Sequence, residues 1–334
     1  MTRPARSTVA LVLSVCLGAA VIVLLVFKAG PDRLLQVLNH ISWWYTAPAL
    51  ACYGAAWFFR TWRLARFTLP QTPSATYLFR IQIAGFALNA ILPMKLGDAL
   101  TVLGLSSVGM NVGRATAIVV QARILDLFVL LMATLPLVLT TLFTDLPRWV
   151  EQALFLLGLS ACLPPIFTVI MCSPRVLGYL DARIQTLRRP RIRAVAGVLL
   201  DAARSYRDIL SRGRLFLESA GLTGLIWLLE AGTTASIAWA VGAPPPFLLL
   251  LPALAVANLS KAAPTTPGGV GVYEAIMAMI LGAGGIAFEH ALAIAMCDHL
   301  LKKAVTLGLG VPCVPALLGP NWKTTISSLK FKDS

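Results

Sequence analysis

The stretch KAAPTTPGGVGVYE, residues 261–274, interrupts an apolar C-terminal third with residues that a membrane-spanning helix does not tolerate. Its prolines and glycines break a helix and leave backbone groups unpaired, which is costly in hydrocarbon. Non-helical backbone at membrane depth occurs where it is buried in protein or lines a watery cavity, and such breaks mark binding sites in transporters. The stretch therefore predicts a binding site within the membrane. The alternative is an ordinary loop outside the membrane.

The apolar segments on either side of this stretch favour the binding-site interpretation. Residues 247–260 and 275–285 are apolar, but each segment is shorter than the roughly 20 residues that cross a bilayer. Two short apolar arms around a tip rich in glycine and proline are typical of a re-entrant hairpin, which enters and leaves the membrane on one side. We name residues 247–285 the second hairpin.

The composition of the whole chain is that of an integral membrane protein. Of its 334 residues, 58% are hydrophobic and 13% are charged, whereas a soluble domain has about 25% charged residues. The apolar runs are long and continuous, which favours membrane helices over the short alternating strands of a β-barrel. We therefore expect an all-α integral membrane protein, with a single polytopic membrane domain over residues 1–334.

The distribution of positive charge predicts how the chain crosses the membrane. The net charge is +14, and basic residues gather near the N-terminus, around 60–80, in 173–214 and in the C-terminal tail. Because basic connectors remain in the cytoplasm, we expect both termini there, in a bacterial-type inner membrane. Arg60, Arg63 and Arg66 are then expected at the cytoplasmic end of the second span. Six full spans are expected near residues 9–27, 43–59, 115–143, 151–171, 216–241 and 287–318.

The connector 173–214 is polar and rich in arginine, and it predicts a contact with the membrane surface. Its apolar residues beyond Pro190 recur near a helical period with arginines between them, and they are Ile192, Val195, Leu199, Tyr206 and Ile209. This pattern predicts an amphipathic helix on the anionic inner leaflet. A nucleic-acid-binding arm is the competing interpretation, but few aromatic residues lie between the arginines. We therefore expect no nucleic-acid partner.

A second interruption, NAILPMKLGDAL at residues 89–100, predicts another re-entrant hairpin, which we name the first hairpin, within residues 79–110. In the expected topology, the first hairpin enters the membrane from the cytoplasmic side and the second hairpin enters it from the outer side. Span, hairpin and span are thus repeated with inverted orientation, in halves near 43–143 and 216–318, as in many secondary transporters. The local match between the two tips is short, and chance resemblance among apolar segments is the alternative.

If the two tips meet near the midplane, they gather charged and helix-breaking residues into one candidate substrate-binding site. Ionisable residues inside a membrane are functional by default. Arg123 with Asp126, and Asp298 with Lys302, are spaced to pair along a helix face, and purely structural ion pairs are the alternative. Glu274 has no near partner in sequence, so we expect it to contact substrate. The candidate residues are Pro93, Lys95, Gly97, Asp98, Arg123, Asp126, Glu230, Lys261, Pro267, Gly268, Gly269, Gly271, Glu274, Asp298 and Lys302.

The mixed charges of this site fit a phosphate or a zwitterionic headgroup better than a simple cation. The N–H groups of Gly268, Gly269 and Gly271 precede a helix, so we expect them to face an anion. The sequence shows no catalytic nucleophile or nucleotide loop beside these residues, and the six cysteines lack the spacing of a disulfide framework or a metal site. We therefore expect no cofactor, no metal and no catalytic residue.

Three motifs, NAILPMKLGDAL, QARILD and PTTPGGVGVYEA, resemble those of the flippase-like membrane domain family. That family includes the membrane half of lysylphosphatidylglycerol synthase, membrane parts of some archaeal glycosyltransferases, and proteins linked to hopanoid synthesis. The resemblance covers about residues 60–310. It adds Asn89 to the candidate residues of the first hairpin, where Asp98 stands in place of the usual glutamate. It also adds His299, which stands where the family has an arginine, whereas Ala122 replaces a usual glutamate.

The resemblance implies movement or handling of a phospholipid, or of an aminoacylated, glycosylated or hopanoid-type lipid. We thus expect a lipid flippase-like transporter, not an enzyme, with a membrane lipid as its substrate. Two alternatives stay open. One is an integral membrane transferase that uses Asp98 or Glu274 as a base on a lipid headgroup, and the other is a non-transporting accessory of a lipid biosynthetic complex. Lipid biosynthetic enzymes as partners and a homo-oligomer are also left open.

Overall fold

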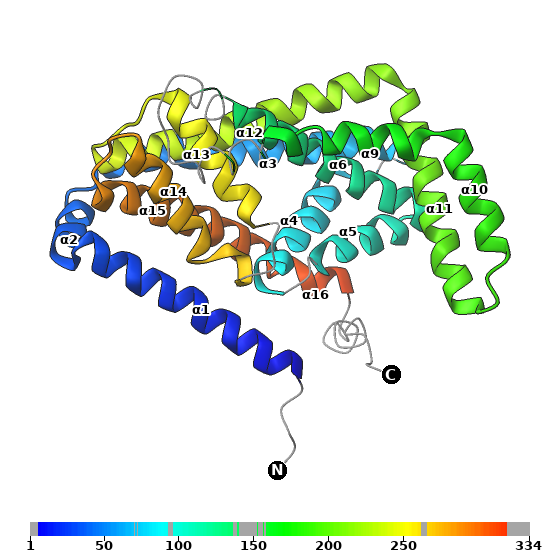
Figure 1. Cartoon of the computed structure of the whole chain (residues 1–334), viewed down its shortest axis with the longest axis horizontal. Coiled ribbons are helices and arrows are strands. Elements are labelled where there is room, and N and C mark those ends of the chain that lie inside the picture. The colour runs from blue at the N-terminus through cyan, green and yellow to red at the C-terminus, as the bar shows by residue number, and fades with distance from the viewer. Residues whose placement is uncertain are drawn as a thin grey trace, which may run out of the picture.

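The computed structural model describes residues 6–69, 71, 73–92, 96–135, 139, 152, 156, 158–261 and 266–318. In this part of the chain every regular element is a helix (Figure 1), which confirms the all-α fold there. Two candidate site residues, Pro93 and Lys95, lie outside the described residues, as do 140–151 between the third and fourth expected spans.

The helices have the following bounds along the chain. They are α1 (Arg6–Ala29), α2 (Pro31–Asn39), η1 (Trp43–Tyr45), α3 (Thr46–Thr68), α4 (Ala75–Ile91), α5 (Leu96–Ser107), α6 (Val112–Ala133), α9 (Leu163–Cys172), α10 (Pro174–Gln185), α11 (Pro190–Ser211), α12 (Gly213–Val241), α13 (Phe247–Ser260), η3 (Pro267–Gly269), α14 (Val272–Ala283), α15 (Phe288–Gly310) and α16 (Cys313–Leu318).

Four segments of the described chain are long and apolar enough to cross a membrane, and they are Val12–Ala29, Val112–Ala133, Gly213–Val241 and Phe288–Leu317. Gly158–Met171 and Pro174–Gln185 form a pair bent by 67°, which makes a fifth candidate if it is one span. The helix α3 has 23 residues, the length of a span, but it carries three arginines. The protein is therefore a multi-pass membrane protein, and the expected number of six spans stays a prediction.

Two antiparallel helix pairs, α4–α5 and α13–α14, occupy the places of the predicted hairpins. In the first pair the helices cross at Gly85 and Gly97, where a Cβ on Gly97 would overlap the carbonyl oxygen of Gly85. Only glycine allows so close a backbone approach. In the second pair, Phe247–Ser260 and Pro267–Ala283 are each too short to span a bilayer. Re-entry of these pairs into the membrane stays a prediction.

The two predicted halves of the chain exchange helices of their predicted hairpins. The helix α4 of the first half packs against α15 of the second, and α13 of the second half packs against α6 of the first, while α3 and α12 lie side by side. One large apolar cluster lies mainly within α12–α15, and another joins α3, α4, α5, α6 and α11.

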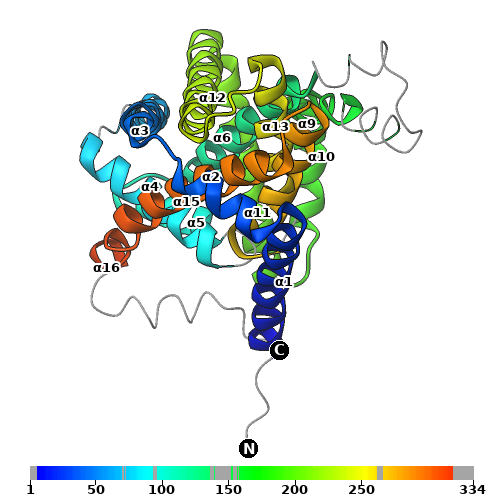
Figure 2. The same cartoon turned by 90° about the vertical axis from the view of Figure 1, so that its left-hand side faces the viewer.

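Two parts of the protein extend from this body. The helix α1 runs away from the other helices towards the N-terminus (Figures 1 and 2). The connector 173–214 forms two packed helices, α10 and α11, at the right-hand end of Figure 1. Its predicted apolar stripe is divided, because Tyr206 and Ile209 are buried in the cluster with α3 and α6, whereas Ile192, Val195 and Leu199 are exposed.

Candidate functional site

The tip of the first hairpin is held by Asn89, which lies near the end of α4. Its side-chain oxygen accepts a hydrogen bond from the N–H of Gly97 at 2.8 Å, and its amide nitrogen donates to Asp98 Oδ1 at 2.9 Å. One side chain thus fixes the start of α5 and the position of the carboxylate. The arrangement explains why an amide, which both donates and accepts, stands at this position.

Asp98 forms a two-pronged ion pair with Arg123 of α6. Arg123 donates from Nε to Oδ2 at 3.1 Å and from Nη2 to Oδ1 at 2.5 Å, and its guanidinium lies 4.6 Å from the centre of the Phe86 ring. This fork leaves the Nη1 donors of Arg123 unused among the described residues. The side chains of Arg123 and Asp98 are 34% and 23% exposed, so this ion pair is accessible to a ligand.

The expected pairing of Arg123 with Asp126 is wrong. Asp126 binds Arg63 of α3, with 2.8 Å between Oδ1 and Nη1. Arg63 also donates to Thr223 of α12 at 2.6 Å. Each residue of the expected pair instead meets an oppositely charged residue from another helix, where the fork of arginine can engage both carboxylate oxygens.

A buried ion-pair network surrounds Glu230 of α12. One of its carboxylate oxygens accepts a hydrogen bond from Arg60 of α3 at 2.8 Å, and the other lies 2.9 Å from Lys302 Nζ of α15. The side chains of Glu230 and Arg60 are 7% and 6% exposed. Glu230 therefore joins α3, α12 and α15 and has no free oxygen for a substrate.

The same network continues through Asp298. Its pairing with Lys302, expected from the i to i+4 spacing, is present at 2.9 Å. Asp298 also accepts hydrogen bonds from Thr234 at 2.7 Å and from the hydroxyl of Tyr273 at 2.6 Å. Tyr273 follows the tip of the second hairpin, so this contact ties the hairpin to α12 and α15. For Asp298 and Lys302 the geometry favours the structural alternative.

Sequence reasoning missed Arg60 and Arg63 as members of the polar interior. Both were expected at the cytoplasmic end of the second span, but α3 continues to Thr68 and the two residues are only 5% and 2% exposed. The i to i+3 spacing of Arg60 and Arg63 was a usable signal, because it places both on one helix face. The acids that receive them lie far away in the sequence.

The second tip is closed by Glu274 of α14. Its Oε2 accepts the N–H of Gly271 at 2.7 Å, and its Oε1 lies 2.6 Å from His299 Nδ1. The N–H of Gly269 is bonded to the carbonyl of Thr266. The N–H of Gly271 thus faces the carboxylate of Glu274 and the N–H of Gly269 faces a carbonyl, so both are used within the tip. Glu274 has a partner after all, supplied by α15.

The structure brings the two tips into contact. A Cβ on Gly268, which follows Pro267, would lie 2.9 Å from the carbonyl oxygen of Ala90 at the end of α4. Gly268 has a φ of 62°, in the left-handed region that favours glycine. Lys261 lies beside this tip, with Nζ 3.9 Å above the Tyr273 ring and 3.1 Å from Asn258 Oδ1.

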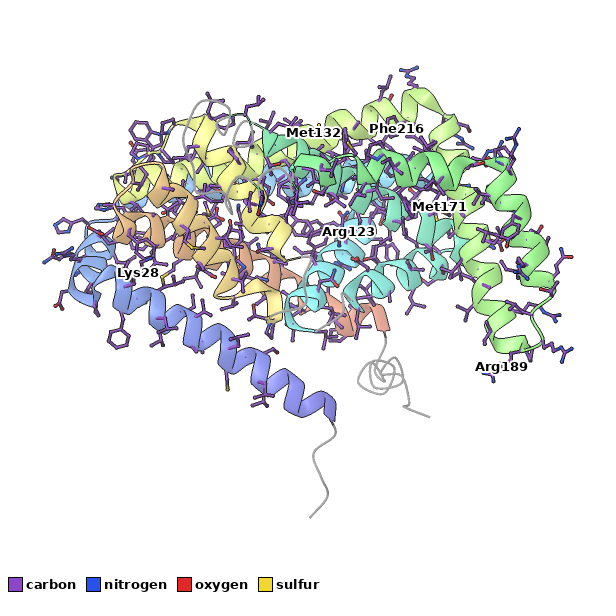
Figure 3. All side chains as sticks on the ribbon, viewed as in Figure 1. Lys28, Arg123, Met132, Met171, Arg189 and Phe216 are labelled. Carbon is purple, nitrogen blue, oxygen red and sulfur yellow. The ribbon has the colours of Figure 1, made fainter. Side chains whose placement is uncertain are left out.

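A cavity of about 740 Å³ lies between α5, α6 and α9, and we name it the groove. Its walls are mostly apolar, and Leu163, Phe167 and Leu103 are 61%, 44% and 42% exposed. The lining residues are Asp98, Ala99, Val102, Leu103, Thr116, Val119, Val120, Arg123, Ile124, Leu127, Leu163, Pro164 and Phe167. The only charged residues among them are Asp98 and Arg123. Figure 3 places Arg123 near the middle of the molecule, between Lys28 and Arg189 at its two ends.

Comparison with known proteins agrees with this architecture. The pattern that defines the family "Lysylphosphatidylglycerol synthase TM region" matches residues 9–310. The chain belongs to this family. Membership in the lysylphosphatidylglycerol synthase TM family confirms the resemblance found in the three motifs, all of which lie inside the matched residues. The family model describes a transmembrane region.

Within the described residues, no group of three or more His, Cys, Asp or Glu side chains is arranged to hold a metal ion.

Individual relatives of this family member come from archaea. Two are named UPF0104 membrane proteins, both from Methanothermobacter thermautotrophicus. One is 23% identical over 90% of this chain and 94% of its own length, and the other is 24% identical over 88% and 90%. Glycosyltransferase AglD of Haloferax volcanii is 32% identical over 36% of this chain but only 20% of its own length.

Proposed function

We propose that this family member is a lipid flippase-like transporter that moves or handles a phospholipid, or an aminoacylated, glycosylated or hopanoid-type lipid, across the inner membrane. The observation that carries the proposal is the groove, a mostly apolar cavity whose lining includes the partly exposed ion pair of Asp98 and Arg123. Ligand sites are mostly apolar, with a few polar groups that fix orientation. An apolar tail with a polar head has the matching distribution of chemistry.

The difference between the charged groups supports the assignment of the head to Asp98 and Arg123. The network around Glu230 is nearly fully buried, and its carboxylate oxygens are occupied by Arg60 and Lys302. Arg123, in contrast, has unused Nη1 donors and lies at the wall of the groove. An ester carbonyl oxygen in the head region of a lipid is an acceptor for such donors. Glu230 and Asp298 then hold the helices that frame the site.

The exchange of hairpins supports an inverted repeat as the basis of movement. The contacts of α4 with α15 and of α13 with α6 are equivalent if residues 43–143 and 216–318 are related by a pseudo-two-fold axis. In transporters of this kind one repeat moves against the other around a central site. We propose that both termini lie in the cytoplasm, which gives the two hairpins opposite sides of entry.

A transferase is the rival function, and the printed name of Glycosyltransferase AglD is its best support. The two bases that such a transferase would use, Asp98 and Glu274, are already engaged by Arg123 and by His299 with Gly271. This favours a role in which neither carboxylate acts as a base, and lipid biosynthetic enzymes as partners stay an open alternative.

The proposal is tested by filling the groove. Leu103→Trp adds bulk to the groove wall, whereas Leu228→Trp adds the same bulk to an exposed position of α12 that is not in the groove. We expect the first variant to lose most lipid movement in reconstituted vesicles, measured with a quenchable headgroup-labelled lipid, and the second to resemble the parent. Equal movement by both variants would refute the role of the groove.

A further inference from the structure

Two lysines at the tip of the second hairpin, Lys261 and Lys303, have no carboxylate within ion-pair distance among the described residues. Lys261 has only the amide of Asn258 and the ring of Tyr273 as close partners. Lys303 has no hydrogen-bond acceptor in the described part of the chain, and its Nζ lies against Gly268. Both side chains are half-buried. Among the described residues near this tip, Glu274, Asp298 and Lys302 are paired, so these two lysines differ from them.

The nearby carboxylates do not neutralise these lysines. Glu274 attracts Lys303, but its oxygens are held by His299 and by the N–H of Gly271. Asp298 and Glu230 attract Lys261 from a greater distance, and both acids are already bonded to Lys302. The two free lysines also repel each other. Unpaired positive charge in a protein interior is unfavourable, and a bound anion would relieve it.

His299 supplies a second and independent sign of a missing ligand. The residue is 3% exposed, and its Nδ1 is bonded to Glu274, but its Nε2 has no hydrogen-bond partner among the residues that the structure describes. A buried polar atom without a partner costs roughly 1 to 3 kcal/mol. Lys261 Nζ lies 3.9 Å from the centre of the Tyr273 ring, and that ring lies 4.5 Å from the ring of His299. Lys261 and Lys303 lie against the adjacent glycines Gly269 and Gly268. The unpartnered nitrogen and the two unpaired lysines therefore belong to one cluster.

This cluster is connected to the head end of the groove. Lys303 Nζ lies against Gly268, and Gly268 lies against the carbonyl of Ala90. Ala90 follows Asn89, whose side chain binds Asp98. Contacts through the junction of the hairpin tips thus link Lys303 to Asp98, which lines the groove.

We propose that Lys261, Lys303 and His299 form a binding site for a phosphomonoester group. The site deepens the proposed function, on which it rests, because it assigns the head of the transported lipid to a chemical class. Two lysines carry up to two positive charges when an anion is bound beside them, and a phosphomonoester carries about −1.5 to −2 near neutral pH, whereas a carboxylate carries only −1. The phosphate oxygens accept hydrogen bonds from the two lysines. Because Nδ1 of His299 donates to Glu274, its Nε2 is an acceptor, and it receives the hydroxyl of a phosphate group that carries one proton. The same chemistry is present in free inorganic phosphate.

The test compares two lipids that differ only in the phosphate. Phosphatidic acid and diacylglycerol with the same chains are titrated into the purified full-length protein in detergent, and binding is followed by thermophoresis. We expect the parent to bind phosphatidic acid at least roughly tenfold more tightly, which corresponds to about 1.4 kcal/mol. In a variant with both Lys261→Gln and Lys303→Gln, the two lipids should bind equally. Lys28→Gln, at an exposed lysine of α1, should retain the preference.

Either of two results would overturn the inference. One is equal binding of the two lipids by the parent protein, and the other is an undiminished preference for phosphatidic acid in the double variant. Diacylglycerol binding shows that each variant is folded, and the single variant Lys303→Gln, expected to show an intermediate preference, replaces the double variant if that one does not fold. Inorganic phosphate is then added as a competitor of phosphatidic acid. Competition would show that the site accepts phosphate without an attached lipid, and no competition would show that the phosphate must belong to a lipid. Both outcomes agree with the proposal. If Leu103→Trp leaves diacylglycerol binding intact, the groove proposal fails, whereas the phosphate preference remains a separate result.

Discussion

Buried charged residues in this protein divide into a closed set, whose members satisfy one another, and an open set that a ligand can reach. Glu230 belongs to the closed set, because Arg60 and Lys302 occupy its two oxygens. Arg123 belongs to the open set, with a third of its side chain exposed at the groove. The physical difference is access, since a buried pair cannot exchange its partner for a substrate without leaving a charge alone.

The closed set predicts a large stability effect for Glu230→Gln. The substitution preserves the shape of the side chain but leaves the charges of Arg60 and Lys302 without a counter-ion inside the protein. We expect a loss of about 3 to 5 kcal/mol in the free energy of unfolding. Denaturation of the purified variant in detergent measures it. Asp208→Asn removes an exposed acid of α11 and should change stability by less than about 0.5 kcal/mol. If the two variants were equally stable, Glu230 would not have the structural role described.

At the same scale, pairs within one helix were only partly predictable from the sequence. The i to i+4 spacing of Asp298 and Lys302 led to the correct pair. The i to i+3 spacing of Arg123 and Asp126 led to the wrong one, because spacing cannot reveal that Asp98 and Arg63 approach from other helices. Ion pairs between residues far apart in the sequence depend on how whole helices pack. The local spacing of residues carries no information about that packing.

At the scale of elements, the hairpins depend on glycines that let helices touch. The break residues around 89–100 and 261–274 predicted where the chain interrupts its helices, and the structure has helix ends at both places. The identity of each tip contact was not predictable. Gly269 and Gly271 were expected to serve an anion, but their N–H groups are used by Thr266 and Glu274 within the tip itself.

Gly97→Ala tests the crossing of α4 and α5. The added methyl group would overlap the backbone of Gly85 and press on Asn89, so the helices must separate. We expect the free energy of unfolding to fall by about 1 to 3 kcal/mol. We also expect reduced lipid movement, because the position of Asp98 depends on this crossing. Gly224→Ala is the matched control, since it lies in α12 with no atom near its added Cβ. It should be neutral or slightly stabilising. A Gly97→Ala variant as stable as the control would contradict the crossing.

At the scale of the whole molecule, α10 and α11 form an arm beside the helical body, with arginines and exposed apolar residues on it. We propose that Ile192, Val195 and Leu199 contact the lipid surface while the arginines bind anionic headgroups. Each basic residue near such a surface contributes about 1 kcal/mol. The burial of Tyr206 and Ile209 against the body fixes the root of the arm.

The arm predicts lipid-dependent fluorescence at Val195. A cysteine placed there carries an environment-sensitive dye, in a full-length protein without native cysteines, and Asp208→Cys on another face of α11 is the control. In anionic nanodiscs we expect the emission at residue 195 to shift to the blue and to return as salt rises, because salt screens charge. An equal shift in neutral nanodiscs would rule out the electrostatic part of this contact.

The central claim is that a lipid chain occupies the groove with its head at Asp98 and Arg123. The most direct measurement is photo-crosslinking of a lipid with a diazirine on its acyl chain to the purified protein, followed by mass spectrometry of the labelled peptides. The account predicts labels concentrated on the groove residues of α5, α6 and α9, such as Leu103, Val120 and Phe167. Leu103→Trp should remove them. Labels spread evenly over the exposed apolar positions of α1 and α12, with none concentrated in the groove, would contradict the account.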